Sequence, residues 1–305
     1  MPVLGHADVS LRYDRAGAGP AVLFVHGWAC NRTFWERQVQ ALRDRYTVVT
    51  VDLRGHGESA RPRTGYTVGA MVGDLERLVR ALAVSGVALV GWSMGGVLAQ
   101  ELAARLGERV TALGLVSTPA GGLAHPKTAE PAADIEAVIS AHFPEFTRRF
   151  AANFFRAGVA SPLYRWAVSQ VRKTPPHVVA ACFDAPPMAE IWRHLGELRV
   201  PTTVMHGRHD TIVPLANGEY LASHIPGGRL MVFEESGHTP FLEEPEAFNA
   251  ALRVLLAAES PGIEPVQATE PEAPALRTEK AGRAGAAGKG RARRATAPRR
   301  PAKRR

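Results

Sequence analysis

Val-Ala-Leu-Val-Gly-Trp-Ser-Met-Gly-Gly, at residues 87–96, decides the fold, because an apolar run leads directly into the pattern G-x-S-x-G. The run predicts a buried strand, and the apolar residues 97–99 that follow predict a helix. A chain that turns from strand to helix over one residue strains that residue, and small neighbours such as Gly91 and Gly95 allow close packing around it. We therefore expect Ser93 to stand above a sheet with its hydroxyl exposed, although an ordinary glycine-rich turn would give the same pattern.

A serine hydroxyl is a weak nucleophile at neutral pH and needs a base and a carboxylate that orients the base. On this kind of scaffold the carboxylate follows the serine along the chain, and the histidine comes last. The apolar run 202–206 predicts a strand that ends shortly before Asp210, and the run 229–233 predicts another that ends before His238. Because all three groups follow strand ends, we predict a catalytic triad of Ser93, Asp210 and His238.

Other acidic and histidine residues occupy less suitable positions. Two carboxylates, Asp134 and Asp184, lie in a segment that we interpret as an inserted cap. Two more, Glu234 and Glu235, precede His238 too closely to reach its far nitrogen easily. The remaining candidates are expected to pack or to make structural hydrogen bonds, and they are His26, His56, His206 and His209.

Acyl transfer also needs donors for the oxyanion that develops in the transition state. The apolar run 21–25 predicts a buried strand, and a His-Gly pair separates it from Trp28. We expect the backbone N–H groups of Trp28 and Met94 to form the oxyanion hole, although the His-Gly pair also suits a simple β-turn. The side chains of Trp28 and Trp92 either flank the serine as an apolar wall or belong to the core.

Five sequence blocks, in this order, resemble the α/β-hydrolase superfamily between about residues 8 and 257. They are Phe24-Val25-His26-Gly27-Trp28, Val51-Asp52-Leu53-Arg54-Gly55-His56-Gly57-Glu58-Ser59, Gly91-Trp92-Ser93-Met94-Gly95-Gly96, Gly207-Arg208-His209-Asp210 and Ser236-Gly237-His238-Thr239-Pro240-Phe241. His-Gly-Trp together with Gly-Trp-Ser is most similar to the pimeloyl-acyl-carrier-protein methyl ester esterases. The block around Ser93 also resembles enol-lactonases, small esterases and cofactor-free haloperoxidase-like enzymes. Related dehalogenases and epoxide hydrolases carry Asp where this chain has Ser93, so the resemblance implies acyl-enzyme chemistry.

Apolar runs that alternate with helical segments predict an α/β fold with a mostly parallel sheet and helices on both faces. We divide the folded part into a first core segment, 1–118, a helical cap insertion, 119–195, and a second core segment, 196–258. Four phenylalanines of the cap recur with helical spacing and predict one aromatic helix face above Ser93. This face either closes the acyl pocket or only attaches the cap to the core. Its members are Phe143, Phe146, Phe150 and Phe154.

The charges of the predicted cap are uneven. Between Phe146 and Phe183 there are six basic residues and no acidic one. Three of them, Arg148, Arg149 and Arg156, point away from the aromatic face on a helical wheel. A solvated basic surface explains them, and so does a docking site for an acidic partner. The resemblance to the methyl ester esterases implies that such a partner would be an acyl carrier protein.

The segment 259–305 forms a basic tail. From Ser260 onward it has 12 Lys or Arg and 4 Asp or Glu, so it carries the whole net charge of +8. It has no aromatic residue and is rich in Ala, Pro, Gly and Arg, which predicts disorder. The tail is either a solvated extension or a non-specific contact for nucleic acid, anionic lipid or another polyanion.

Several classes of protein do not fit the sequence. No apolar run approaches 18 residues, and the N-terminus has no basic segment followed by an apolar one. We therefore expect a cytoplasmic protein with no transmembrane helix. Two cysteines, Cys30 and Cys182, build no disulfide framework. No evenly spaced His, Cys or carboxylate cluster indicates a metal site, and we expect no cofactor.

These patterns together predict a serine carboxylic-ester hydrolase that acts on a small or medium acyl ester through an acyl-enzyme intermediate. The resemblance narrows this to a pimeloyl-acyl-carrier-protein methyl ester esterase. A lactonase, a thioesterase or a perhydrolase-like enzyme would use the same three residues. A protein that only binds polyanions through its tail would not need Ser93, Asp210 and His238 together.

Overall fold

The computed structural model describes most of the folded part of the 305-residue chain. The described residues are 3–6, 9–120, 135–183 and 195–257. Asp134 and Asp184, which we considered as rival carboxylates, lie outside these ranges. The predicted basic tail lies outside them as well.

Eight strands of the described residues form one sheet. They are β1 (Val3–His6), β2 (Val9–Ala16), β3 (Ala21–Val25), β4 (Thr47–Val51), β5 (Val87–Trp92), β6 (Val110–Val116), β7 (Thr202–Gly207) and β8 (Arg229–Phe233). Their order across the sheet is β1-β2-β4-β3-β5-β6-β7-β8. β2 pairs antiparallel with both β1 and β4, and the remaining pairs are parallel. The predicted mostly parallel sheet is therefore confirmed.

The central strands are buried on both faces. Every residue of β3 and of β5 is buried. Val22 and Phe24 belong to one core cluster. Leu23 and Val25, which alternate with them along β3, belong to the other cluster. A strand with two buried faces must be apolar throughout, which explains why the sequence shows continuous apolar runs rather than alternation.

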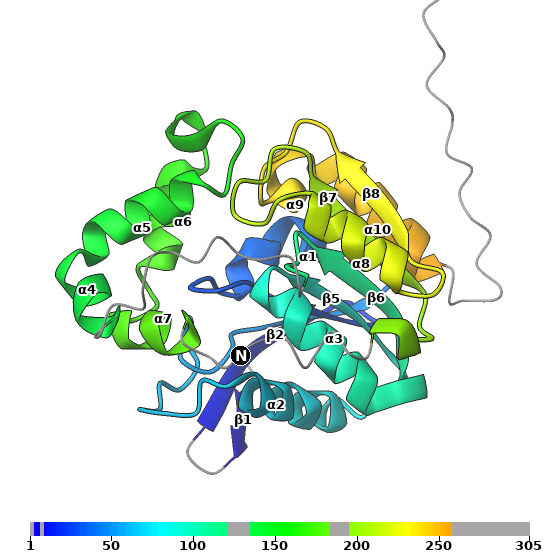
Figure 1. Cartoon of the computed structure of the whole chain (residues 1–305). Coiled ribbons are helices and arrows are strands. Elements are labelled where there is room, and N and C mark those ends of the chain that lie inside the picture. The colour runs from blue at the N-terminus through cyan, green and yellow to red at the C-terminus, as the bar shows by residue number, and fades with distance from the viewer. Residues whose placement is uncertain (1–2, 7–8, 121–134, 184–194, 258–305) are drawn as a thin grey trace, which may run out of the picture. The chain divides into compact units, whose positions relative to one another are not determined.

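Helices cover both faces of the sheet (Figure 1). They are α1 (Glu36–Leu42), α2 (Val68–Ala81), α3 (Met94–Leu106), α8 (Ala216–His224), α9 (Pro240–Glu243) and α10 (Pro245–Ala257), with short 3-10 helices at Arg32–Trp35 and Gly107–Arg109. Leu42 of α1 and Leu252 of α10 pack in the cluster of Phe24. Leu75 of α2 and Leu98 of α3 pack in the other cluster. The predicted α/β architecture with helices on both faces is thus confirmed.

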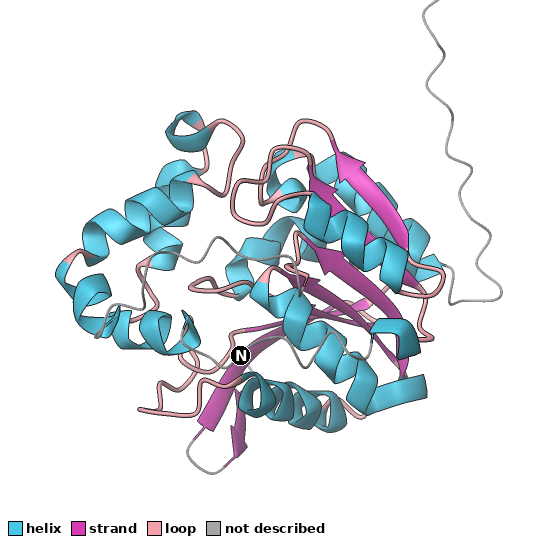
Figure 2. Cartoon of the chain, viewed as in Figure 1, coloured by secondary structure: helices cyan, strands magenta, loops and turns pink. Residues whose placement is uncertain are grey.

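Four α-helices of the described residues lie between β6 and β7, in the segment that we interpreted as a cap. They are α4 (Ile135–Ala141), α5 (Phe143–Ala152), α6 (Tyr164–Val171) and α7 (Pro176–Phe183), with a 3-10 helix at Gly158–Ala160. Figure 1 shows these helices grouped beside the sheet. Figure 2 shows the arrows of the parallel strands pointing toward that side. The cap helices therefore lie on the side of the strands' carboxyl ends, where parallel sheets present their functional groups.

The aromatic stripe of the cap is not one helix face. α5 ends before Phe154, so the expectation that all four phenylalanines share a helix is wrong for this residue. The stripe continues in space because neighbouring rings contact one another. Their centroids are 6.2 Å apart for Phe143 and Phe146, 5.6 Å for Phe146 and Phe150, and 4.8 Å for Phe150 and Phe154.

Candidate active site

Ser93 occupies the turn between β5 and α3 in a conformation that residues other than glycine rarely adopt. Its φ is 54° and its ψ is −120°. Its N–H donates to the carbonyl of Val116 in β6 (2.8 Å). Such a conformation costs about 1–3 kcal/mol and persists only where the surrounding structure fixes it. Ser93 also stays partly exposed, although Trp92 before it is buried, as expected for a nucleophile raised above a strand end.

Glycines on both sides of Ser93 are required by close backbone contacts. A Cβ atom on Gly91 would lie 2.2 Å from the carbonyl oxygen of Gly95. A Cβ atom on Gly95 would lie 2.3 Å from the carbonyl oxygen of Val25 in β3. These distances are far below van der Waals contact, so both positions must lack a side chain. The sequence pattern around Ser93 thus has the steric cause that we inferred from the sequence.

Asp210 follows β7 and is 7% exposed. Its Oδ1 atom accepts the backbone N–H groups of Ile212 (2.9 Å) and Val213 (2.8 Å). Its Oδ2 atom lies 2.7 Å from Nδ1 of His238 and 3.4 Å from Nε2 of His206. Both oxygens of the Asp210 carboxylate are therefore fixed by hydrogen bonds, and Oδ2 faces the imidazole of His238.

The environment of Asp210 favours its ionised form. Burial alone would raise the pKa of this carboxyl group, but the charge of His238 and the hydrogen bonds from His206 and His238 lower it well below its usual range. Asp210 is consequently a carboxylate at neutral pH. It can orient the imidazole and stabilise the imidazolium that forms when His238 takes up a proton.

His238 lies in the loop between β8 and α9 and is 1% exposed. Its Nδ1 atom contacts the carboxylate of Asp210, so in the neutral ring this nitrogen carries the proton and donates it. Its Nε2 atom is then the basic nitrogen, which is the arrangement that a general base for a serine hydroxyl requires.

Trp92 connects His238 to Ser93. Its indole N–H donates to the carbonyl of His238 (2.9 Å), and the two rings lie 5.4 Å apart. Ser93 is the next residue, so the structure brings the three predicted residues to one region. Trp92 itself is 1% exposed and packs against the rings of Phe34 and Phe241. Of the two interpretations left open for Trp92, the core aromatic describes it, because its buried ring is enclosed by other rings.

The backbone segments expected to form the oxyanion hole lie next to Ser93. Gly27, which precedes Trp28, is so close that a Cβ atom on it would lie 3.2 Å from Cβ of Ser93. Met94 is the first residue of α3, and N–H groups at a helix N-terminus stabilise negative charge. Both backbone segments are therefore suited to donate toward an oxyanion formed at Ser93.

Trp28 joins the core to the cap. Its indole N–H donates to the carbonyl of Val179 in α7 (3.0 Å). Its ring meets Phe146 and Phe150 edge-on, with centroids 5.7 and 5.1 Å away. These two phenylalanines also line a cavity of about 530 Å³, to which none of the predicted triad residues contributes. Phe143 stacks on Phe146 and packs against the core cluster of Phe24. The other residues that line this cavity are Val138, Ile139, His142, Glu145, Arg149 and Asn153.

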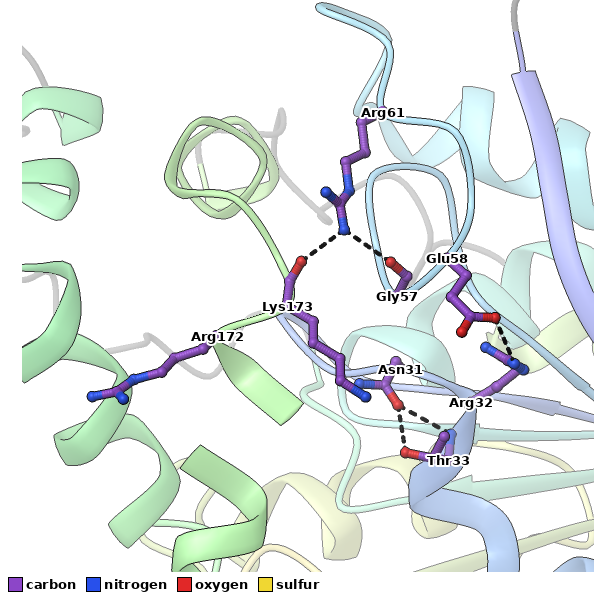
Figure 3. A pocket seen from close by; sticks show the side chains of 8 residues that line it. All are labelled: Asn31, Arg32, Thr33, Gly57, Glu58, Arg61, Arg172 and Lys173. Carbon is purple, nitrogen blue, oxygen red and sulfur yellow. Dashed lines mark hydrogen bonds and ion pairs between the residues drawn. The ribbon is translucent and has the colours of Figure 1, made fainter. Parts of the chain in front are cut away.

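A further cavity of about 470 Å³ lies at the junction of cap and core (Figure 3). Its lining residues are Asn31, Arg32, Thr33, Gly57, Glu58, Arg61, Arg172 and Lys173. Arg32 is neutralised by Asp52 (2.5 Å) and Glu58 (2.9 Å). Arg61 donates to the backbone carbonyl of Lys173 (3.0 Å), so it fastens a core loop to the cap. None of the predicted triad residues lines this cavity. Arg172 donates to Thr147 and Lys173 to Gln170, both within the cap.

Two of the three arginines expected to dock an acidic partner are paired within the chain. Arg149 contacts Glu145 (2.6 Å), which lies one helical turn earlier. Arg156 contacts Glu235, which lies in the loop of His238. Arg148 is exposed on α5. The basic surface thus carries less unpaired positive charge than the sequence suggested. Glu145 precedes the segment between Phe146 and Phe183, and Glu235 comes from a distant loop, so neither was counted there.

The rival histidines make structural hydrogen bonds. His26 accepts the N–H of Leu53 at Nε2 (3.0 Å), and its Nδ1 donates to the carbonyl of Gly27 (2.8 Å). Burial lowers the pKa of His26 to about 4. Burial, together with the neighbouring His26, lowers the pKa of His56 to about 3. Both rings are therefore neutral at physiological pH.

The remaining rivals are also excluded by their contacts. Glu234 forms two hydrogen bonds with Arg208 (2.7 and 2.8 Å) on an exposed surface and does not face His238. Burial raises the pKa of the Cys30 thiol well above its usual value, and that of Cys182 to about 12. Neither thiol would supply a thiolate nucleophile at neutral pH.

Within the described ranges, no group of three or more His, Cys, Asp or Glu residues is placed to hold a metal ion. In the same part of the chain, no helix combines the length and the apolar character needed to cross a membrane.

The sequence analysis did not identify Glu243, whose carboxylate contacts the loop of His238. The only sequence signal for Glu243 is its position five residues after His238. The role of His206 beside Asp210 was foreseen only as packing around that loop.

Known proteins match nearly the whole described part of this chain. The model of the alpha/beta hydrolase family matches residues 22–251. The chain is 29% identical to the AB hydrolase superfamily protein YisY of Bacillus subtilis, over 80% of this chain and 94% of that protein. It is 28% identical to 3-oxoadipate enol-lactonase 2 of Acinetobacter baylyi, over 82% and 94%. It is 27% identical to a pimeloyl-[acyl-carrier protein] methyl ester esterase of Nitrosomonas europaea, over 78% and 96%.

Solved structures agree with these relatives. An esterase from Exiguobacterium antarcticum superposes with a TM-score of 0.73 at 28% identity, covering 82% of this chain and 96% of that one. A bromoperoxidase from Bacillus anthracis superposes with a TM-score of 0.72 at 27% identity, covering 82% and 96%.

Proposed function

The chain belongs to the alpha/beta hydrolase family and is a hydrolase, and we propose that it cleaves carboxylic esters with Ser93 as the nucleophile. The observation that carries this proposal is the strained turn at Ser93 beside the hydrogen-bonded pair of Asp210 and His238. Relatives and structural neighbours named as esterases support the same reaction class.

The reaction would begin with the transfer of the Ser93 hydroxyl proton to Nε2 of His238. The serine oxygen then attacks the ester carbonyl, and Asp210 stabilises the imidazolium through Nδ1. His238 returns the proton to the leaving alcohol as the acyl-enzyme forms. A water molecule, deprotonated by the same imidazole, hydrolyses the acyl-enzyme and restores the serine.

The negative charge of each tetrahedral intermediate would be stabilised by backbone N–H groups of Trp28 and Met94. Gly27 supports this assignment because it places the backbone before Trp28 in contact with Ser93. Met94 supports it because it begins α3, and the dipole of that helix adds to the effect. Fixed donors of this kind act without reorganisation in the transition state.

The acyl group would contact the aromatic rings that face Trp28. Phe146 and Phe150 meet that ring, and Gly27, the residue before Trp28, lies beside Ser93. An enol-lactonase among the relatives makes lactone hydrolysis the second candidate, because a lactone is a cyclic ester that the same triad would open.

A narrower proposal is that the substrate is an ester attached to an acyl carrier protein. The methyl ester esterases among the relatives are named for such a substrate. In this chain Arg148 is exposed on α5, the helix that also carries Phe146 and Phe150. Arg149 and Arg156 would first have to leave Glu145 and Glu235, so they are weaker docking candidates than Arg148.

The proposal is tested by hydrolysis of p-nitrophenyl esters from acetyl to dodecanoyl. We expect activity in the wild type and a fall of at least about 10³-fold in Ser93→Ala. Ser223→Ala, a substitution on the exposed part of α8, is the matched control and should hydrolyse the esters at the wild-type rate. A methyl ester offered free and on a carrier protein then measures the contribution of the carrier.

Retention of a substantial fraction of the activity in Ser93→Ala would refute the serine mechanism.

A further inference from the structure

Two consecutive glutamates hold the loop that carries His238. Glu244 accepts the N–H of Glu235 (3.1 Å) and the hydroxyl of Ser236 (2.5 Å). Glu243, the last residue of α9, accepts the N–H of Gly237 (2.9 Å) with its Oε2 atom. The irregular segment before His238 is therefore tied to the end of α9 through the side-chain carboxylates of Glu243 and Glu244.

Glu243 differs from Glu244 because it also reaches the cap. Its Oε1 atom accepts the N–H of Arg156 (2.7 Å), which lies just after the aromatic stripe. One carboxylate thus joins the N–H before His238 to an N–H of the cap. Glu244 contacts the loop alone in the bonds described above.

The loop and the cap are in direct contact around this carboxylate. The hydroxyl of Thr239 donates to the carbonyl of Phe154 (2.9 Å). A Cβ atom on Gly237 would lie 2.8 Å from the backbone nitrogen of Arg156. The ring of Phe154 in turn lies 6.3 Å from the imidazole of His238. Any displacement of the cap at Phe154 would therefore press on the imidazole or on the residues that flank it.

We propose that Glu243 is a positioning residue that fixes His238 relative to the cap. The base at the reaction centre and the cap wall of the acyl pocket are thereby held in one arrangement. The inference rests on the proposed function of His238 as the base, and it adds a residue that does not itself touch the substrate.

The chemistry of the site requires a carboxylate at this position. Two backbone N–H groups from different segments approach the two oxygens of Glu243. A glutamine has one acceptor oxygen, so its NH₂ group would face one of these donors and that bond would be lost. Burial raises the pKa of Glu243, so the neutral amide also removes an unfavourable buried charge. Glu243→Gln therefore disturbs the positions of the two segments more than it disturbs folding.

The kinetic test compares two Glu→Gln variants of the full chain with p-nitrophenyl butanoate as the substrate. For Glu243→Gln we expect kcat to fall by about 10-fold or more while KM changes by less than about 3-fold, because the base acts in the chemical step. Glu234→Gln, in the same loop but paired on the surface with Arg208, is the matched control and should stay within about 2-fold. A kcat of Glu243→Gln within 2-fold of the wild type, or a loss confined to KM, would overturn the proposal.

Hydrogen exchange supplies a readout that does not depend on activity. Glu243→Gln should accelerate amide exchange at Arg156 or at Gly237, whichever N–H loses its acceptor. Glu244→Gln should accelerate exchange at Glu235 and leave Arg156 and Gly237 unchanged. Unchanged exchange at both Arg156 and Gly237 in Glu243→Gln would overturn the proposal.

The two readouts separate this inference from the proposed function. A wild type that hydrolyses no ester but shows the expected exchange pattern would refute the proposed function and leave the link between loop and cap standing. An active wild type with an equally active Glu243→Gln would refute the positioning role of Glu243 and leave the proposed ester hydrolysis standing.

If Glu243→Gln does not fold, Thr239→Val takes its place, since it removes the hydroxyl that lies 2.9 Å from the carbonyl of Phe154 and 3.3 Å from Oε2 of Glu243. We expect this variant to lower kcat by about 5-fold, the effect of one hydrogen bond. Wild-type kcat in Thr239→Val would then overturn the proposal.

Discussion

Asp210 sets the tautomer of His238, and at the residue scale this is the contact on which the proposed chemistry depends most. Replacement by Asn keeps the shape but offers Nδ1 an N–H donor, so the ring would carry its proton on Nε2 and lose its basic nitrogen. We expect kcat of Asp210→Asn to fall about 10³–10⁴-fold with little change in KM, as measured by ester hydrolysis. A fall of less than 10-fold would mean that another group orients the imidazole.

His26 and His56 give the fold a predictable response to acid. Their folded pKa values are lowered, chiefly by burial, to about 4 and about 3, whereas an unfolded His titrates near about 6.5. Between these values the unfolded state binds protons that the folded state does not, so stability is complete above pH 6.5 and falls as the pH decreases. Each residue contributes at most about 1.4 kcal/mol per pH unit in this window.

The free energy of unfolding of the wild type and of His56→Gln, measured by urea denaturation from pH 7 to pH 5, checks this expectation. The variant should lose less stability per pH unit than the wild type, whatever its stability at pH 7. Parallel curves would show that His56 titrates normally in the folded protein.

At the scale of elements, the turn from β5 into α3 depends on the absence of a side chain at Gly95. An Ala there would place Cβ 2.3 Å from the carbonyl oxygen of Val25. We expect Gly95→Ala to lose more than about 3 kcal/mol of stability or to fail to fold. Gly69→Ala, on the exposed face of α2 with only a distant arginine nitrogen at 3.9 Å, should gain about 0.5–1 kcal/mol.

Thermal and urea unfolding of the two glycine variants compares them directly. Equal stabilities would show that the contact between β3 and the serine turn is looser than the structure indicates.

Strands and turns that are determined by neighbouring residues in the chain could be predicted from the sequence. The apolar runs before Ser93, Asp210 and His238 gave the strand ends because buried parallel strands must be apolar throughout. Long-range pairs gave no local signal. Glu235 meets Arg156 across the fold, and Glu243 meets the cap through a backbone N–H. The end of α5 before Phe154 was missed because phenylalanine spacing alone does not show where a helix stops.

At the scale of the whole molecule, the charge separates the chain into two parts. The net charge of +8 belongs to the segment after residue 259, and the preceding residues are neutral overall. A chain ending at residue 258 should therefore hydrolyse esters like the full chain but lose affinity for heparin or DNA. Affinity of the full chain should fall steeply with salt, because the binding releases counterions. Salt-insensitive binding, or binding that survives the truncation, would contradict this account.

The central claim is that Ser93 is the nucleophile, and labelling by a fluorophosphonate tests it most directly. The reagent phosphonylates a serine only when a neighbouring base activates it. Peptide mapping by mass spectrometry of the labelled protein should find one adduct, on the peptide that contains Ser93, with loss of ester hydrolysis in proportion to labelling. Asp210→Asn should label much more slowly. An adduct on another residue, or an unlabelled protein that still hydrolyses esters, would contradict the account.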